Sequence, residues 1–261
     1  MKKLLLGLFL FTLSLTMVGC NNGEDNSLEN ILDKGKIVVG FTEFPPMGYE
    51  EKCKVIGFDI DLATQVANIL GINVEFKYID WNSKVFELES GRVDVIWNGM
   101  TITEERLNQM EFTKKYIDNN LIILTLKESN IETLQDLNNK TIGVESTSSG
   151  QIALEKNKNI FNSLKQMKEY DTSNSALLAL ESGAIDVMIV DEIYARYYVL
   201  NKSDKFKIGT EIVGVEEYGI GLLKGSIKLR NKIDELIDEL ALEGKVQEIS
   251  NKWFNTNLYS R

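Results

Sequence analysis

The sequence predicts an α/β protein built from two similar lobes. Short apolar runs alternate with amphipathic stretches, and glycines separate them, as in chains whose strands alternate with helices. The segment Leu88–Val95 (LESGRVDV) also returns 92 residues later as Leu180–Val187 (LESGAIDV). Each copy reads as a helix end, a glycine stop and a strand start, so the same unit is expected twice.

The elements can be placed by their periodicity. Strands are predicted at Lys36–Gly40, Val74–Tyr78 and Val93–Trp97, and Lys140–Val144 loosely echoes the first of these. Helices are predicted over Asp59–Leu70, through Val85 and Leu88 to Ser90, after an N-cap at Thr103, and over Ile227–Glu243. We expect the last helix and the following Val246–Phe254 to pack on the first lobe.

The N-terminus has the pattern of an export signal. Lys2 and Lys3 precede the apolar stretch Leu4–Met17, which is shorter than the ~20 residues that span a bilayer. The following Met17–Cys20 resembles the lipobox of bacterial lipoproteins, in which the cysteine is lipidated. This predicts a signal peptide at 1–19, lipidation of Cys20 and a tether at 20–27, with the protein anchored on the extracytoplasmic face of the cell membrane. The alternative is a secretory signal with a chance cysteine.

The composition excludes several function classes. With 29 basic and 39 acidic residues, the net charge of −10 would repel nucleic acid. The absence of histidine excludes Ser-His-Asp triads, Cys-His pairs and the usual catalytic zinc sites. Cys53 is the only cysteine besides Cys20, so no structural metal cluster is expected. Carboxylate-only catalysis remains possible. No metal or cofactor is expected, and we expect a monomer that is not an enzyme.

The repeated units also indicate where a ligand would bind. In open α/β sheets ligands lie beyond the carboxyl ends of the strands. Residues 98–101 follow a predicted strand in the first unit, and Asp191 follows the corresponding strand in the second. The cleft between the lobes is the predicted site.

Several motifs together resemble one family, the solute-binding proteins of polar amino-acid ABC importers. The resemblance covers about Leu28 to Phe254, and its markers are Phe44-Pro45-Pro46, Gly57–Leu62, Leu88–Gly91 with Asp94, Gly99–Arg106, Tyr218-Gly219 and Trp253-Phe254. It implies a two-lobed periplasmic-binding-protein fold, each lobe a mixed sheet flanked by helices, joined by hinge strands near Tyr116–Asn119 and Glu216–Tyr218. Lobe 1 would comprise 28–117 and 219–261, and lobe 2 would comprise 118–218.

The resemblance implies that an amino acid is captured by hinge closure and delivered to an ABC permease. It assigns the ligand's α-carboxylate to Arg106 and the backbone at Thr101, and the α-amino group to Gly99 and Asp191. This agrees with charge chemistry, because a zwitterion needs a cation and an anion, and guanidinium pairs bidentately with carboxylate. The side chain, whether polar, sulfur-containing or basic, would lie between Phe44 and Trp81.

Further positions carry weaker assignments. Glu43 lies near an acidic position that selects side chains in relatives, and Thr147, Ser148 and Ser149 follow a strand where a helix N-terminus could bind a carboxylate. A departure from the family is Phe112–Tyr116 (FTKKY), which lacks the usual hinge proline.

Other interpretations remain open. Arg106 could be a surface residue, Asp191 an N-cap of the helix starting at Glu192, Phe44 and Trp81 core residues, and the Thr147–Ser149 segment a simple cap. A rival function is an exported cyclohexadienyl-dehydratase-like enzyme, with Glu145 or Glu192 as general acid. A third is a ligand-sensing partner of a membrane receptor.

Overall fold

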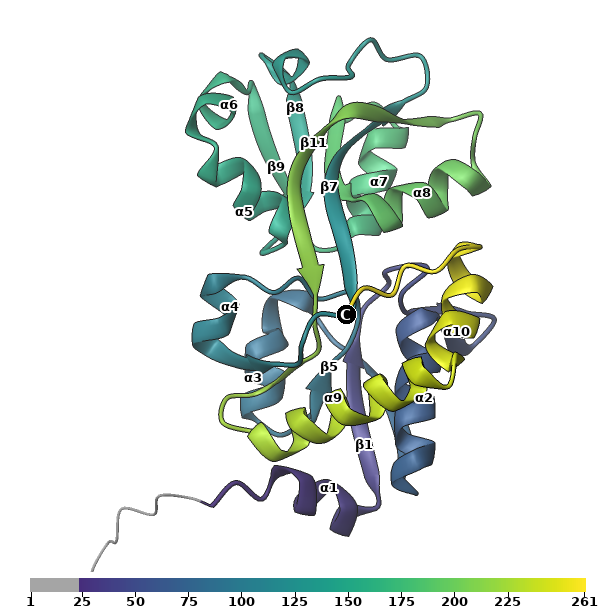
Figure 1. The fold of residues 1–261 in the computed structure, drawn as a ribbon. Helices are drawn as coiled ribbons and strands as arrows, with labels where there is room; N and C mark the ends of the chain where they lie inside the picture. Colours follow the sequence, from purple (N-terminus) through teal and green to yellow (C-terminus); the bar gives the residue numbers. More distant parts are fainter. Residues whose placement is uncertain (1–23) are drawn as a thin grey trace, which may run out of the picture.

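The computed structural model describes residues 24–261 and shows two α/β lobes, one above the other (Figure 1). Lobe 1 contains a five-stranded sheet of order β4-β1-β5-β12-β6, and lobe 2 a five-stranded sheet of order β11-β7-β10-β8-β9. The predicted fold class is confirmed. The predicted signal peptide and Cys20 lie outside the described residues.

Each sheet mixes parallel and antiparallel pairs. In lobe 1, β1 is parallel to β4 and β5, whereas β12 is antiparallel to β5 and β6. In lobe 2, β8 is parallel to β9 and β10, whereas β7 is antiparallel to β10 and β11. The strands are β1 (Lys36–Phe41), β2 (Tyr49–Glu51), β3 (Lys54–Ile56), β4 (Asn73–Tyr78), β5 (Val95–Ile96), β6 (Met110–Phe112), β7 (Ile117–Leu126), β8 (Thr141–Glu145), β9 (Gln166–Tyr170), β10 (Val187–Asp191), β11 (Phe206–Tyr218) and β12 (Gly221–Leu223).

Helices flank both sheets. Those of lobe 1 are α1 (Ser27–Lys34), α2 (Phe58–Leu70), η1 (Trp81–Ser83), α3 (Lys84–Glu89), α4 (Glu104–Gln109), α9 (Ile227–Leu242) and α10 (Lys245–Phe254). Those of lobe 2 are η2 (Gln135–Leu137), α5 (Ser149–Lys156), α6 (Lys158–Ser163), α7 (Ser173–Glu181) and α8 (Glu192–Asn201). Within residues 24–261, no helix combines the length and apolar character needed to traverse a bilayer.

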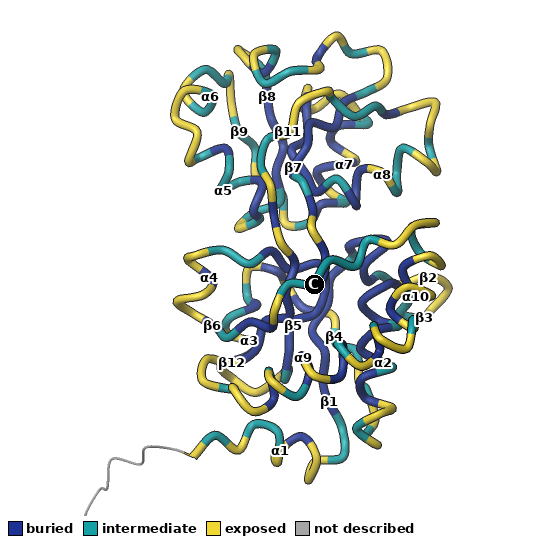
Figure 2. Tube along the Cα trace, viewed as in Figure 1, coloured by how far each residue is buried: buried dark blue, intermediate teal, exposed yellow. Residues whose placement is uncertain are grey.

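The C-terminal helices pack on lobe 1, as the sequence predicts. Helix α10 contacts α2 and α9, and Trp253 Nε1 donates to Asp61 Oδ2 at 2.7 Å. Figure 2 shows that the central strands β1 and β7 are buried along most of their length, whereas exposed segments gather at the periphery. The largest apolar cluster runs through both lobes, and a smaller cluster lies within each lobe.

The sequence repeat is a structural repeat. Gly91 and Gly183 both adopt left-handed backbone conformations after α3 and α7. Directly before the next strand, Asp94 Oδ2 accepts from Val38 N, and Asp186 Oδ2 accepts from Thr141 N, both at 2.7 Å. The strand expected over Val93–Trp97 is shorter, because the Asp94 carboxylate takes the hydrogen bond of Val38 and the ladder begins only at Val95.

Two long strands, β7 and β11, connect the lobes (Figure 1). They pair from Tyr218 opposite Ile117 to Phe206 opposite Leu126. At the lobe 1 end, Lys115 Nζ lies 2.8 Å from Asp118 Oδ1 and 3.0 Å from Glu217 Oε1. An ion-pair network thus stands beside the crossing point.

Candidate functional site

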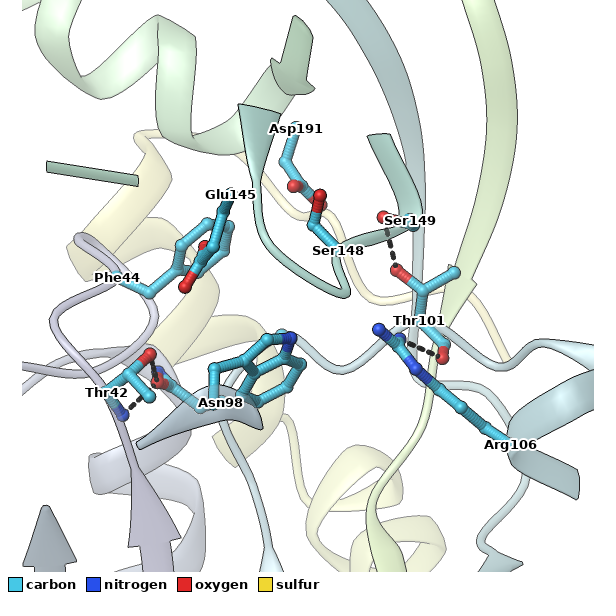
Figure 3. A pocket seen from close by; sticks show the side chains of 11 residues that line it. Thr42, Phe44, Asn98, Thr101, Arg106, Glu145, Ser148, Ser149 and Asp191 are labelled. Carbon is cyan, nitrogen blue, oxygen red and sulfur yellow. Dashed lines mark hydrogen bonds between the residues drawn. The ribbon is translucent and has the colours of Figure 1, made fainter. Parts of the chain in front are cut away.

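A cavity with an empty volume of about 340 Å³ lies between the lobes (Figure 3). Residues from both lobes line it, chiefly at strand ends and the loops that follow. The lining residues are Thr42, Phe44, Trp81, Asn98, Gly99, Thr101, Arg106, Glu145, Ser148, Ser149 and Asp191. Eight of the predicted ligand residues therefore meet in one cavity.

Arg106 is a buried cation held by backbone carbonyls. The side chain of Thr103 accepts from Arg106 N at 3.2 Å and caps α4, which brings Arg106 to the cavity. Its Nη1 donates to Thr101 O at 2.8 Å and its Nη2 to Thr147 O at 3.1 Å. Only 4% of the residue is exposed, which contradicts the surface interpretation. Burial lowers its pKa, but a guanidinium stays charged, so Arg106 brings a positive charge to the cavity.

Asp191 ends β10 on the opposing lobe. Its Oδ1 accepts from Asn119 Nδ2 at 2.9 Å and from the Tyr218 hydroxyl. Its side chain does not cap helix α8; instead, Asn119 Oδ1 accepts from Ile193 N at 3.3 Å. Asp191 is therefore the N-cap residue of α8 by position, but its carboxylate makes no capping hydrogen bond and lines the cavity.

A second carboxylate stands beside Asp191. Asn119 Nδ2 also donates to Glu216 Oε2 at 2.8 Å, and Thr101 Oγ1 donates to Glu216 Oε1 at 3.1 Å. Burial, followed by the charge of Glu216, raises the pKa of Asp191 well above its ordinary value. Such an acidic pair favours a cation nearby. Sequence reasoning placed Glu216 at a crossing strand but missed its role here.

Gly99 presents backbone to the cavity. Its φ is 60°, and a Cβ would lie 3.1 Å from Phe44 Cε1 and 3.2 Å from Tyr218 Cε2. Gly99 N donates to Asp59 Oδ2 at 2.7 Å, and the Tyr116 hydroxyl donates to the same oxygen at 3.0 Å. Burial raises the pKa of Asp59 to about 7. Asp59 thus holds the backbone of Gly99 in place. From the sequence, Asp59 was identified only as part of the Gly57–Leu62 motif, and this role was missed.

Phe44 and Trp81 line the cavity and also belong to the apolar interior. They are 7% and 8% exposed. The ring of Phe44 stacks on Tyr194 of lobe 2 at 5.2 Å, and the guanidinium of Arg106 lies 5.5 Å from the Trp81 ring. The predicted core role is confirmed, and the same two rings are also exposed to the cavity where a ligand contact is predicted.

Of the remaining predicted residues, Ser148 and Ser149 line the cavity, whereas Thr147 and Glu43 do not. Ser148 Oγ accepts from Gln151 N at 3.2 Å and caps α5. The hydroxyl oxygens of Thr101 and Ser149 lie 3.3 Å apart across the lobes. Thr147 does not line the cavity, because its backbone turns with φ 57° and its hydroxyl contacts Lys84 and Asn82.

Glu43 also lies outside the cavity. Its Oε1 accepts from Glu50 N at 3.0 Å, which directs the carboxylate toward the β2–β3 hairpin. Of the two acids considered for the enzyme alternative, Glu145 lines the cavity. Glu192 accepts instead from Asn120 Nδ2 at 2.6 Å and pairs with Arg196.

Comparison with known proteins identifies the family. Residues 37–256 match the model of the bacterial extracellular solute-binding proteins, family 3. The chain belongs to this family. The arginine-binding extracellular protein ArtP of Bacillus subtilis is 29% identical, with 97% of this chain and 98% of that protein covered. The L-cystine-binding protein TcyJ of Escherichia coli is 27% identical, with coverages of 98% and 97%.

A solved structure gives the same result for the fold of this family member. The substrate-binding protein of an ABC uptake transporter from Streptococcus pneumoniae, with bound histidine, superposes with a TM-score of 0.87 at 36% identity. The match covers 91% of this chain and 99% of that chain. The family-3 fold therefore accounts for both lobes, and the cavity lies between them.

Proposed function

We propose that this family-3 solute-binding protein captures a free α-amino acid on the extracytoplasmic face of the membrane and delivers it to an ABC permease, without catalysing a reaction. The observation that carries the proposal is a buried arginine and a buried aspartate on opposing lobes of one cavity, Arg106 and Asp191. Relatives named for binding arginine and cystine support it.

The two ends of a zwitterion match this arrangement. A planar carboxylate can pair with the guanidinium of Arg106 in a bidentate manner. The ammonium group would bind near Asp191 and Glu216, and a cation there relieves the repulsion between these two acids. Phe44 and Trp81 supply apolar contact for the side chain.

Contacts across the cleft support capture by closure. Arg106 of lobe 1 donates to Thr147 O of lobe 2, and Thr101 of lobe 1 contacts Ser149 of lobe 2. We infer that the ligand binds first to lobe 1 and that lobe 2 then closes by bending of β7 and β11. Micromolar binding corresponds to about −8 kcal/mol, which two charged contacts and an aromatic slot can supply after the cost of closure.

We further propose that Cys20 carries the lipid anchor, because Met17–Cys20 follows an export signal. The expected result is incorporation of labelled palmitate into the full chain in a Gram-positive host, and release of a Cys20→Ser variant into the medium. An unlabelled wild-type chain would contradict the anchor and leave the binding proposal intact.

The binding proposal is tested at Arg106 by calorimetry on residues 24–261. A screen of free amino acids first identifies the preferred one. Arg106→Ala should then weaken its binding about 30-fold or more, because a partner of a buried charge pair is lost. The α-amide of the same amino acid lacks the carboxylate and should be insensitive to the substitution.

Arg92→Ala is the matched control, because Arg92 is an exposed arginine of lobe 1 that pairs with Glu87. It should leave binding unchanged. A chain that binds none of the amino acids, or an Arg106→Ala variant that weakens the acid and its amide equally, overturns the proposal.

A further inference from the structure

Glu145 is an acidic residue of the cavity that has no role in the proposed binding of the ligand's α-carboxylate and α-amino group. It ends β8 of lobe 2, is partly buried and lines the cavity. Ser173 Oγ donates to its Oε2 at 2.6 Å. A hydroxyl is a neutral partner, so the carboxylate has no neutralising contact from this residue.

The cations whose charges act on Glu145, Lys84 and Arg106, make their hydrogen bonds to other groups. Lys84 Nζ donates to Trp81 O and to Thr147 Oγ1, both at 3.0 Å. Arg106 donates to the carbonyls of Thr101 and Thr147. Within residues 24–261, Glu145 therefore forms no ion pair, although it is an acid that lines the cavity.

The position of Glu145 relates it to the side chain of a ligand. In Figure 3, Arg106 lies on one side of the cavity and Glu145 on the opposite side, the side of Phe44. An amino acid with its α-carboxylate at Arg106 and its ammonium at Asp191 would extend its side chain away from Arg106. That direction leads past the aromatic residues Phe44 and Trp81 toward Glu145.

The acid of lobe 1 does not compete for this role. Glu43, the position expected to select side chains, holds Glu50 N and lies outside the cavity. The two other lobe 1 side chains near Phe44, Thr42 and Asn98, are neutral and bound to each other, since Thr42 Oγ1 donates to Asn98 Oδ1 at 3.1 Å. Selection of a charged ligand side chain in this part of the cavity therefore depends on an acid of lobe 2, Glu145.

We propose that Glu145 receives the cationic end of the ligand's side chain, so that this chain selects basic amino acids of the arginine and lysine class over neutral isosteres. The inference rests on the proposed function and names its substrate class. It also assigns the choice of ligand to lobe 2, because an amino acid with a neutral side chain would still contact Arg106 and Asp191 but would lack the contact with Glu145.

The titration of Glu145 gives an independent readout. Burial raises its pKa to about 7, although Ser173 and the charges of Lys84 and Arg106 lower it. Tyr78 and Tyr194 are the other titratable groups near it. A bound cation would lower this pKa, so binding near pH 7 should release protons, and affinity for a basic ligand should fall as the pH drops below 7.

The test compares arginine with citrulline and lysine with norleucine, two pairs that differ in side-chain charge. Calorimetry uses residues 24–261 as wild type, Glu145→Gln and the control Glu43→Gln. We expect wild type and Glu43→Gln to prefer the basic member of at least one pair about 30-fold or more. In Glu145→Gln this preference should collapse, while citrulline binding remains.

Proton release, measured in buffers of different ionisation enthalpy, should accompany the basic ligand in wild type and be smaller in Glu145→Gln. Equal preference ratios in wild type and Glu145→Gln would overturn the role of Glu145, as would a wild type that favours the neutral member of both pairs. In these outcomes amino acids still bind in an Arg106-dependent manner and the proposed function stands. A chain that binds no amino acid overturns both.

Discussion

The two lobes carry the same structural unit but end it with different chemistry. In each, a helix ends at a left-handed glycine, an aspartate binds the first strand, and the next strand runs to the cavity. Ninety-two residues separate the copies, and the same offset relates Gly99 of lobe 1 to Asp191 of lobe 2. One lobe offers backbone at that position, and the other offers a carboxylate.

This difference shows how a duplicated framework becomes a site. The repeat fixes where the strands end, and the residue placed at each end decides the local charge. The cationic lining residue, Arg106, comes from lobe 1, and the acidic ones, Glu145 and Asp191, come from lobe 2. A zwitterion therefore gains both charged contacts only when it touches both lobes, which couples binding to closure.

The largest effect is expected at the position where the lobes differ, with Asp191→Asn. Loss of the carboxylate should weaken binding of the preferred amino acid by about 2 to 5 kcal/mol, or about 30-fold or more. In the ligand-free protein the same change should raise the unfolding temperature near pH 7, because the raised pKa of Asp191 means that its ionisation beside Glu216 costs stability as the pH rises through that pKa. Calorimetry and thermal unfolding measure the two effects.

An analogue without the α-amino group is the matched ligand for this test. It should bind wild type weakly and lose little further affinity in Asp191→Asn. If the variant weakens the analogue and the amino acid by the same factor, Asp191 acts through closure of the lobes and does not contact the ammonium group.

The sequence was informative about the framework and about Arg106. Local signals such as the glycine stops and the Thr103 cap lie within a few residues of the elements they define, and the structure reproduces them. Long-range placement was harder to predict. Glu216 reaches Asp191 through Asn119 because two strands distant in sequence pair there. Thr147 and Glu43 turn away because of local backbone and hairpin contacts that no spacing rule contains.

An intermediate effect is expected where the lobes agree, at Asp94 and Asp186. Either residue changed to alanine leaves the backbone N–H of Val38 or Thr141 without its acceptor, which should cost about 1 to 3 kcal/mol. Asp94→Ala should lose slightly more, because Asp94 also pairs with Lys34 at 2.7 Å. Urea unfolding followed by circular dichroism measures both losses.

Tryptophan fluorescence makes this comparison specific to one lobe. The three tryptophans, Trp81, Trp97 and Trp253, all belong to lobe 1. Asp94→Ala should shift the fluorescence transition, and Asp186→Ala should shift it equally only if the lobes unfold together. Asparagine at either position keeps an acceptor oxygen and should recover much of the loss. If Asp186→Ala costs much less unfolding free energy than Asp94→Ala, Asp186 does not have the structural role of Asp94.

The smallest effect is expected for Gly91→Ala and Gly183→Ala. Their φ values are 67° and 74°, and a Cβ at either position would meet nothing within 4 Å. The cost is therefore that of the left-handed backbone alone, about 1 kcal/mol or about 2 to 4 °C in Tm, and it should be the same in both lobes. Asparagine tolerates this conformation better, so asparagine variants should lose less stability at both sites.

Gly99→Ala is the contrasting case. Its Cβ would also crowd Phe44 and Tyr218, so the substitution should reduce ligand binding as well as Tm. If all three alanine variants lose the same Tm and Gly99→Ala binds the ligand as well as wild type, the cavity does not require glycine at position 99.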